Sequence, residues 1–276
     1  MKHFAGRIKY WGIWNEPNIG FFMGTADRYR EVLEAAHAAA KEADPNCVVL
    51  FGGTAGFGFD FIEEVCSKGN ARKCFDILNV HDYPPFPEGN YYLELRDATR
   101  LARRLGKKEV WVTETGRGAF GDQQAAFLAR AFIISLTLRN KGINRVFWYQ
   151  MFYDPREAMG LLFENGRRRR SFYAYKTLTH LLEGARWAGT ARTRGGPAKG
   201  RVFALRYRTR NSTVIAVWRN TTLPFFGEEE KVRVRVGRRP LSAVDLYGNE
   251  ISVTRDGRWV EIPCSWRPVY LVLRRR

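Results

Sequence analysis

Two glutamates at the ends of apolar stretches offer the clearest chemistry in this sequence. Glu16 follows the aromatic run Tyr10–Trp14 and Asn15, and Pro17 ends that run. Glu114 ends a second apolar stretch of the same design. Both stretches are typical of buried strands. A carboxylate at the tip of a buried strand is costly unless it is paired or has a function.

Two carboxylates on neighbouring strand ends suit the hydrolysis of a glycosidic bond. One protonates the leaving oxygen, and the other attacks the anomeric carbon when the pair lies roughly 5 Å apart. Asn15, next to the first glutamate, could hold a sugar hydroxyl near the reacting centre. The alternative for Glu16 and Glu114 is structural, with each carboxylate paired at its strand end and neither taking part in catalysis.

Aromatic side chains at strand ends provide faces on which sugar rings can pack. Tyr83 and Trp148 stand at such ends. Because Trp148 and Tyr149 are adjacent, only one of them faces inward from a regular strand. Alternation from Gln150 favours Trp148 and places Tyr149 beneath a helix.

Strand and helix patterns alternate five times over about the first 185 residues. Continuous apolar strands separated by helices indicate a parallel sheet with a covered outer face. In a β/α barrel, the carboxyl ends of such strands carry the active site. The predicted strands are 8–15, 48–51, 75–81, 109–115 and 145–152, and the predicted helices are 25–43, 59–67, 91–105, 122–140 and 171–182.

The pattern changes near Thr190. Thr193–Pro197 is typical of a linker, and short alternating segments follow at 201–208, 214–219, 231–236, 242–246 and 268–273. This alternation predicts an antiparallel β domain, most simply a sandwich. We therefore expect a catalytic domain over residues 1–189 and a β domain over residues 190–276.

The composition is that of a globular protein, with 45% hydrophobic and 14% aromatic residues. No apolar run is long enough to span a membrane. The start of the sequence lacks the apolar region of a signal peptide, so we expect a cytoplasmic location, with secretion possible if the natural start lies upstream. The four cysteines have no metal-ligand spacing. We expect free thiols, and the alternative is a local disulfide between Cys66 and Cys74.

The formal net charge of +18 is large. It suggests a polyanionic partner, either nucleic acid or an acidic polysaccharide. The alternative, which the even spread of basic residues favours, is an arginine-rich solvated surface of the kind found in heat-adapted proteins. No nucleic-acid-binding motif is present. The run Arg167–Arg170 is either a solvated loop or a site for an anionic sugar such as a uronate.

The motifs together resemble the clan A glycoside hydrolases, most closely the family 39 and family 5 type. Residues 14–18 and 113–116 resemble their two catalytic strands, residues 81–84 resemble the motif of strand 6, and 158–162, 172–175 and 268–271 resemble later segments. The resemblance implies a retaining mechanism, with Glu16 as acid/base and Glu114 as nucleophile. It also implies that His81 and Tyr83 line the sugar site, although His81 could instead be a hydrogen-bonded core histidine.

The resemblance implies further a carbohydrate substrate, such as a β-glycoside or polysaccharide, and no metal or organic cofactor. The family barrel has eight strands, whereas this sequence begins just before strand 4. We therefore expect an incomplete TIM-type (β/α) barrel, with the equivalents of strands 4–8, whose edges at 8–15 and 146–152 are open and apolar. Self-association or a partner chain would cover these edges. The alternative function is a carbohydrate-binding or weakly active remnant of such an enzyme.

Overall fold

The computed structural model describes residues 1–195, 201–220, 230–237 and 241–274. The chain forms two compact units. The first unit comprises residues 1–84, 90–116 and 141–149, and the second comprises residues 85–89, 117–140 and 150–276. The predicted boundary between residues 189 and 190 falls inside the second unit, so an independent β domain stays a prediction. Among the described residues, no helix has the length and apolar character needed to cross a bilayer.

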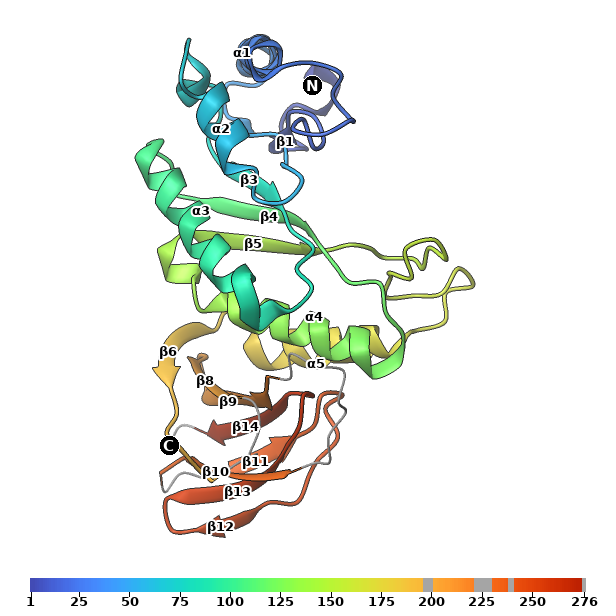
Figure 1. Ribbon diagram of the computed structural model, residues 1–276, viewed down its shortest axis with the longest axis vertical. Helices are drawn as coiled ribbons and strands as arrows, with labels where there is room; N and C mark the ends of the chain where they lie inside the picture. Colours follow the sequence, from blue (N-terminus) through green and yellow to red (C-terminus); the bar gives the residue numbers. More distant parts are fainter. Residues whose placement is uncertain (196–200, 221–229, 238–240, 275–276) are drawn as a thin grey trace. The chain divides into compact units, whose positions relative to one another are not determined.

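The first unit contains two parallel ladders, β1-β2 and β3-β4-β5, which single bridges join into one sheet (β3, β4 and β5 lie side by side in Figure 1). Parallel ladders join β1 to β2 and join β3, β4 and β5, while single bridges from Leu50 to Ile77 and from Thr54 to Val80 connect the two groups. All five predicted strands are therefore present. Their bounds are Tyr10–Gly12 (β1), Val48–Leu50 (β2), Leu78–His81 (β3), Val110–Thr115 (β4) and Ile143–Trp148 (β5).

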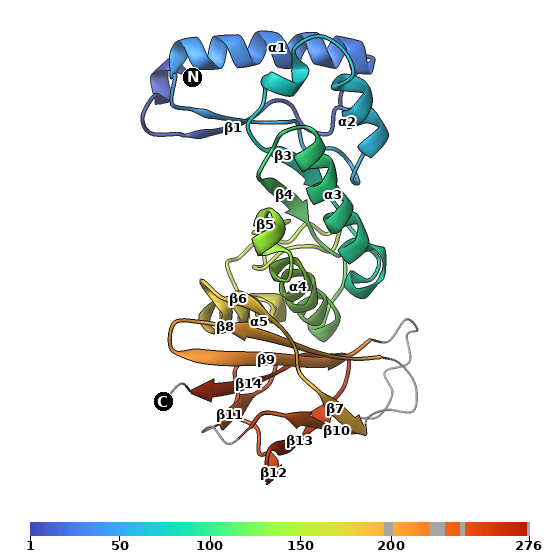
Figure 2. The same ribbon diagram turned by 90° about the vertical axis from the view of Figure 1, so that its left-hand side faces the viewer.

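Three helices belong to the first unit: α1 (Ala26–Ala43), α2 (Phe59–Val65) and α3 (Tyr92–Arg104). Helix α1 begins at Ala26 because the hydroxyl of Thr25 accepts a hydrogen bond from the backbone N–H of Arg28. The fully buried Tyr29 of α1 donates its hydroxyl proton to the Ile13 carbonyl and accepts from the Gly52 N–H, both at 2.8 Å. Helix α1 (Figure 2) thereby fixes the chain that leads into Glu16.

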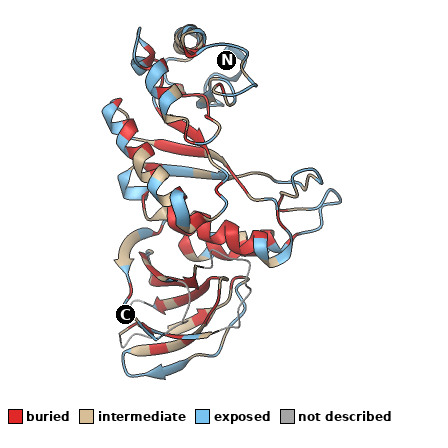
Figure 3. Cartoon of the chain, viewed as in Figure 1, coloured by how far each residue is buried: buried red, intermediate tan, exposed pale blue. Residues whose placement is uncertain are grey.

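The two edges of this sheet are open within the described residues. No described strand pairs with the outer side of β1 or β5. Figure 3 shows β4 buried and β5 largely exposed. Tyr10 on β1 and Phe147 on β5 are 42% and 45% exposed. The edges predicted to be open and apolar are therefore present.

The second unit combines two helices with two antiparallel sheets. Helices α4 (Gly121–Leu136) and α5 (Arg170–Leu182) pack together, and α4 is buried along most of its length (Figure 3). The sheets have the orders β11-β14-β9-β8-β6 and β12-β13-β10-β7, and they share one apolar core. The strands are Arg186–Thr190 (β6), Thr193–Gly195 (β7), Val202–Arg208 (β8), Ser212–Arg219 (β9), Glu230–Arg235 (β10), Leu241–Val244 (β11), Thr254–Asp256 (β12), Trp259–Cys264 (β13) and Val269–Arg274 (β14).

Part of the predicted linker is a strand. Residues 193–195 form β7, which pairs with β10, and Pro197 lies outside the described residues. Strand β6 also joins β8, so the antiparallel sheet begins before residue 190. Sequence patterns missed both strands because β6 and β7 are short edge strands whose exposed side chains give no clear alternation.

All four cysteines are buried and free, as expected, and the alternative disulfide between Cys66 and Cys74 is absent. Burial raises the pKa of the Cys66 thiol to about 11. This thiol therefore stays protonated at neutral pH and is a poor nucleophile.

Asp122 connects the helices of the second unit to its β sheets. Its carboxylate accepts hydrogen bonds from Arg170 at the start of α5, from the Tyr247 hydroxyl, and from Arg267 at 3.1 Å. Burial opposes the charge on Asp122, but the hydrogen bonds from Tyr247 and Arg170 outweigh it and hold the pKa of this carboxyl below its ordinary 3.8.

Replacing Asp122 with Asn should lower the free energy of unfolding by about 2 kcal/mol at pH 7, because charge-assisted hydrogen bonds are lost. A carboxyl with a lowered folded-state pKa stabilises the protein above its unfolded pKa and loses that effect as the pH falls through the folded value. The difference in the free energy of unfolding between Asp122→Asn and the wild type should therefore shrink below pH 3.8. Denaturant unfolding at several pH values measures this difference, with Asp97→Asn on α3 as control, since this carboxylate is half-exposed and pairs with its helix neighbours Arg96 and Arg100. A difference that does not depend on pH would contradict this role.

Candidate active site

Glu16, His81 and Glu114 come together in the first unit. One oxygen of each carboxylate and one ring nitrogen of His81 all lie within 4.8 Å of one another. The register of the parallel sheet explains this, because His81 at the end of β3 pairs with Glu114 in β4. Asn15 forms a bridge to Gly53 after β2, and the Glu16 N–H donates to the Gly53 carbonyl at 2.8 Å.

The backbone that presents Glu16 is strained. Trp14 and Glu16 have φ angles of 74° and 44°, in the left-handed region that non-glycine residues avoid. Each such residue costs about 1–2 kcal/mol. The Trp14 indole donates to the Phe21 carbonyl at 3.0 Å and helps hold this conformation. Strain of this kind concentrates at functional sites.

Gly53 gives His81 room to reach Glu16. A Cβ atom at position 53 would lie 2.1 Å from Nε2 of His81, far inside van der Waals contact. His81 itself is buried, with its side chain 4% exposed, so the ring has little space into which to move. The glycine at position 53 is therefore required by a close approach of backbone and imidazole.

A chain of hydrogen bonds defines where one proton lies. The Thr113 hydroxyl donates to Oδ1 of Asn79 at 2.7 Å, so its oxygen can only accept from Nε2–H of His81, 3.0 Å away. Nδ1 of His81 lies 3.0 Å from Oε1 of Glu16. If the ring is neutral, Nδ1 accepts and Glu16 must carry the proton. If the ring is charged, the same proton sits on Nδ1. The His81–Glu16 pair thus holds one transferable proton.

Glu114 has a different environment. The Tyr83 hydroxyl donates to its Oε2 at 2.6 Å, and Nδ1 of His81 lies 3.7 Å from the same oxygen. Burial, followed by the hydrogen bond to Glu114, raises the pKa of Tyr83 well above its ordinary value, so Tyr83 remains a donor. The Glu114 side chain is 25% exposed, against 12% for Glu16. One carboxylate therefore shares a proton and the other accepts hydrogen bonds.

The aromatic residues differ partly from expectation. Tyr149 packs edge-to-face against Tyr83, with ring centroids 6.2 Å apart, instead of lying beneath a helix. Trp148 ends β5, is half-buried and pairs with Thr115 in the ladder. Asn15 is exposed and is fixed through its backbone. Contacts of Asn15 and Trp148 with a sugar stay predictions.

The run Arg167–Arg170 is divided between two kinds of environment in the second unit. The buried Arg169 donates to the carbonyls of Gly160 and Ala119 at 2.9 and 3.0 Å, and Arg170 pairs with Asp122. These two arginines hold protein loops and helices together. A role in binding an anionic sugar stays a prediction for the other two members of the run.

The cluster also has a donor set that a metal ion could use, with two carboxylate oxygens and an imidazole nitrogen. In the described structure Glu16 is hydrogen-bonded to His81, and Glu114 accepts a hydrogen bond from Tyr83. The expectation that the protein needs no metal stays a prediction.

Comparison with known proteins decides the fold. No protein-family profile and no curated protein matches the sequence. A family 39 glycoside hydrolase from Bacteroides cellulosilyticus WH2 superposes with a TM-score of 0.81 and 23% identity, over 99% of this chain and 59% of that one. The fold is that of the clan A glycoside hydrolases.

More distant structures have the same clan A fold. An α-L-arabinofuranosidase from Thermotoga maritima gives a TM-score of 0.70 at 14% identity, covering 98% of this chain and 67% of its own. A family 30 endoxylanase from Clostridium papyrosolvens C71 gives 0.66 at 13% identity, with 96% and 65% covered. The chain thus spans about three-fifths to two-thirds of the length of these TIM-barrel enzymes, which agrees with a partial barrel.

Three residues that hold the cluster of Glu16, His81 and Glu114 in place were not expected from the sequence. Gly53 gives the His81 ring its room, and Thr113 and Asn79 fix Nε2 of His81 through a chain of hydrogen bonds. One signal was available. Asn79 is a polar residue within the apolar stretch 75–81, and such a residue must find a buried partner.

Replacing Gly53 with Ala should lower the free energy of unfolding by about 2 kcal/mol, because the new methyl group collides with the His81 ring. The variant should also lose most of any activity that depends on the His81–Glu16 contact. Gly20→Ala is the matched control, since a Cβ there meets no atom within 4 Å. Thermal and denaturant unfolding measure the effect. Equal stability of the two variants would show that His81 is not held against Gly53.

Proposed function

We propose that this chain is a retaining glycoside hydrolase, with Glu16 as acid/base and Glu114 as nucleophile. The observation that supports it best is the cluster in which oxygens of both carboxylates and a nitrogen of His81 lie within 4.8 Å of one another. Retaining enzymes have carboxyl groups roughly 5–5.5 Å apart, whereas inverting enzymes need roughly 6.5–9.5 Å to fit a water.

In the first step, Glu114 attacks the anomeric carbon while the bond to the leaving oxygen breaks. Glu16 gives that oxygen the proton that it shares with His81. In the second step, Glu16 takes a proton from water, and the water oxygen displaces Glu114 from the sugar. The enzyme returns to its starting protonation state.

Each neighbouring group has a place in this reaction. Tyr83 donates to Glu114 at 2.6 Å and keeps its carboxylate aligned before attack. Thr113 holds the His81 ring in the orientation that presents Nδ1 to Glu16. Asn15 and Trp148 are proposed to contact the sugar. The substrate is proposed to be a β-glycoside, oligosaccharide or polysaccharide, and no metal takes part.

The second candidate is a carbohydrate-binding or weakly active remnant of such an enzyme. The open edges at β1 and β5 favour it, because no described strand closes the barrel there. The two candidates differ in whether a covalent intermediate forms on Glu114.

A panel of aryl β-glycosides followed by the 2-deoxy-2-fluoro analogue of the preferred sugar tests the enzyme. Peptide mass analysis should find the sugar bound to Glu114. Glu114→Gln should lose activity by about 10³-fold or more, and Glu16→Ala by about 10²–10⁴-fold on poor leaving groups. Azide should restore turnover of Glu16→Ala on an activated substrate, because azide needs no general base.

Glu109→Gln is the control, since this carboxylate lies next to the start of β4 and accepts from the Trp111 indole. It should retain wild-type activity. Glycan binding without labelling or turnover would favour the binding protein, and labelling at another residue would contradict the assignment of Glu114.

We also propose that a second polypeptide covers the open sheet edges, either another copy of this chain or a partner. Exposed apolar residues on unpaired edge strands favour pairing with another chain. Tyr10 and Phe147 are such residues.

Sedimentation velocity over a range of concentrations should therefore detect a species heavier than the 31.9 kDa chain. Phe147→Glu should shift it toward monomer, because a charge on the edge strand opposes pairing. Leu93→Glu changes an exposed apolar residue on α3 and should not shift it. A monodisperse monomer at all concentrations would rule out self-association, and a purification that yields no partner chain would then reject this proposal.

A further inference from the structure

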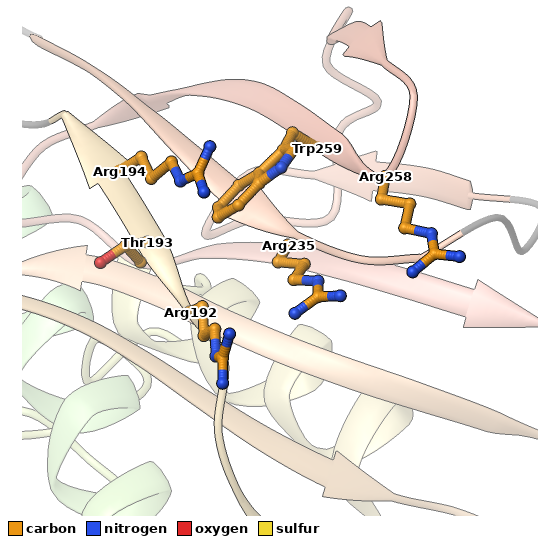
Figure 4. A pocket seen from close by; sticks show the side chains of 6 residues that line it. All are labelled: Arg192, Thr193, Arg194, Arg235, Arg258 and Trp259. Atoms are coloured by element: carbon orange, nitrogen blue, oxygen red, sulfur yellow. The ribbon is translucent and has the colours of Figure 1, made fainter.

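Four arginines gather around one tryptophan in the second unit, and none of these residues takes part in the proposed reaction. They line a cavity of about 410 Å³ (Figure 4). The lining residues come from three segments of the chain: Arg192, Thr193 and Arg194 at β7, Arg235 at the end of β10, and Arg258 and Trp259 at the start of β13.

Backbone hydrogen bonds fix these segments side by side. The Arg235 N–H donates to the Arg192 carbonyl, and the Val236 N–H donates to the Arg258 carbonyl, both at 2.9 Å. Arg235 also stands directly opposite Trp259 in the antiparallel ladder. Neighbouring strands lie only about 4.8 Å apart, so the arginines are held together by the sheet itself.

The charges of this cavity are not balanced as they are elsewhere on the same sheet. Arg233 pairs with Asp256 and Glu261 at 3.4 and 3.5 Å, and Lys231 pairs with Glu261 at 3.2 Å. Among the residues that the structure describes, none of the four cavity arginines has a carboxylate within ion-pair distance. Like charges on adjacent strands are destabilising. The arrangement therefore has a cost that an anionic ligand would remove.

Arg194 is held in place by the tryptophan. Its guanidinium lies over the Trp259 ring, 4.4 Å from the centroid (Figure 4). A cation–π contact of this kind restricts a long side chain without neutralising it. Less conformational freedom is then lost when Arg194 binds an anion.

We propose that this cavity binds the acidic groups of an anionic glycan, namely a uronate carboxylate or a sulfate ester. Guanidinium groups bind both oxyanions in a bidentate manner. The choice of a glycan rests on the proposed function, since a sugar polymer is the substrate class of the first unit. The cavity is thus proposed as an anchoring site made of residues other than Glu16 and Glu114.

A nucleic acid fits this surface less well. Single-stranded nucleic acids are bound by a basic groove with aromatic faces on which bases stack. Here the single aromatic residue of the cavity already carries Arg194 on its ring. The site is suited to one or two acidic groups.

Binding of polygalacturonate, heparin oligosaccharides and neutral xylan, measured by isothermal titration at moderate salt, tests the proposal. The full chain should bind at least one acidic glycan and should not bind xylan at this site. Arg235→Gln/Arg258→Gln should weaken acidic-glycan binding by about tenfold or more. The double variant Arg235→Lys/Arg258→Lys keeps the charge and should lose only part of the affinity for the acidic glycan, because lysine cannot bind an oxyanion in a bidentate manner. Comparison of the affinities for polygalacturonate and for heparin distinguishes a carboxylate ligand from a sulfate ligand.

Arg206→Gln/Arg208→Gln on β8 removes the same charge elsewhere on the second unit and should bind as the wild type does. An equal loss of acidic-glycan binding in both double variants would show that only the net charge matters, and it would overturn the proposal. Tighter binding of a single-stranded DNA of matched charge would overturn it in favour of nucleic acid. The binding assay needs no turnover, so its outcome is independent of the proposed hydrolase activity. Failure to label Glu114 would reject the proposed hydrolase activity. Acidic-glycan binding that is lost in Arg235→Gln/Arg258→Gln would still support the cavity as a binding site.

Discussion

The imidazole of His81 occupies the space between two carboxylates that would otherwise repel each other. Its Nδ1 lies 3.0 Å from Glu16 and 3.7 Å from Glu114. The ring can do this only because Gly53 has no side chain and because Thr113 holds the opposite nitrogen. A buried carboxylate without such a partner would be strongly unfavourable. The rest of the first unit keeps this ring in position.

Helix α1 of the first unit stabilises the backbone around Glu16 and Gly53. Tyr29 links α1 to Ile13 and Gly52, the residues that precede Glu16 and Gly53. The left-handed backbone at Glu16 is unfavourable in isolation, and these contacts stabilise it. Tyr29 therefore helps to hold the backbone that presents Glu16, through its two hydrogen bonds to the chain.

The strands and the charged members of the site could be predicted from the sequence, because strand periodicity and a motif at each strand end report on them directly. The predicted strands carried Glu16, His81 and Glu114 to one edge of the sheet, and the structure brings them together with Tyr83. Gly53 could not be predicted, since its role appears only when the His81 ring approaches in three dimensions. Tyr149 was misplaced because strand alternation breaks down where β5 ends.

Glu16, His81 and Glu114 all belong to the first unit, whereas Asp122 and the cavity arginines belong to the second. The chain is divided into two compact units, and regions of different stability within one chain open at different temperatures. The geometry of Glu16, His81 and Glu114 on warming therefore reports on the first unit, and a probe of the antiparallel sheets reports on the second. These are two separate measurements.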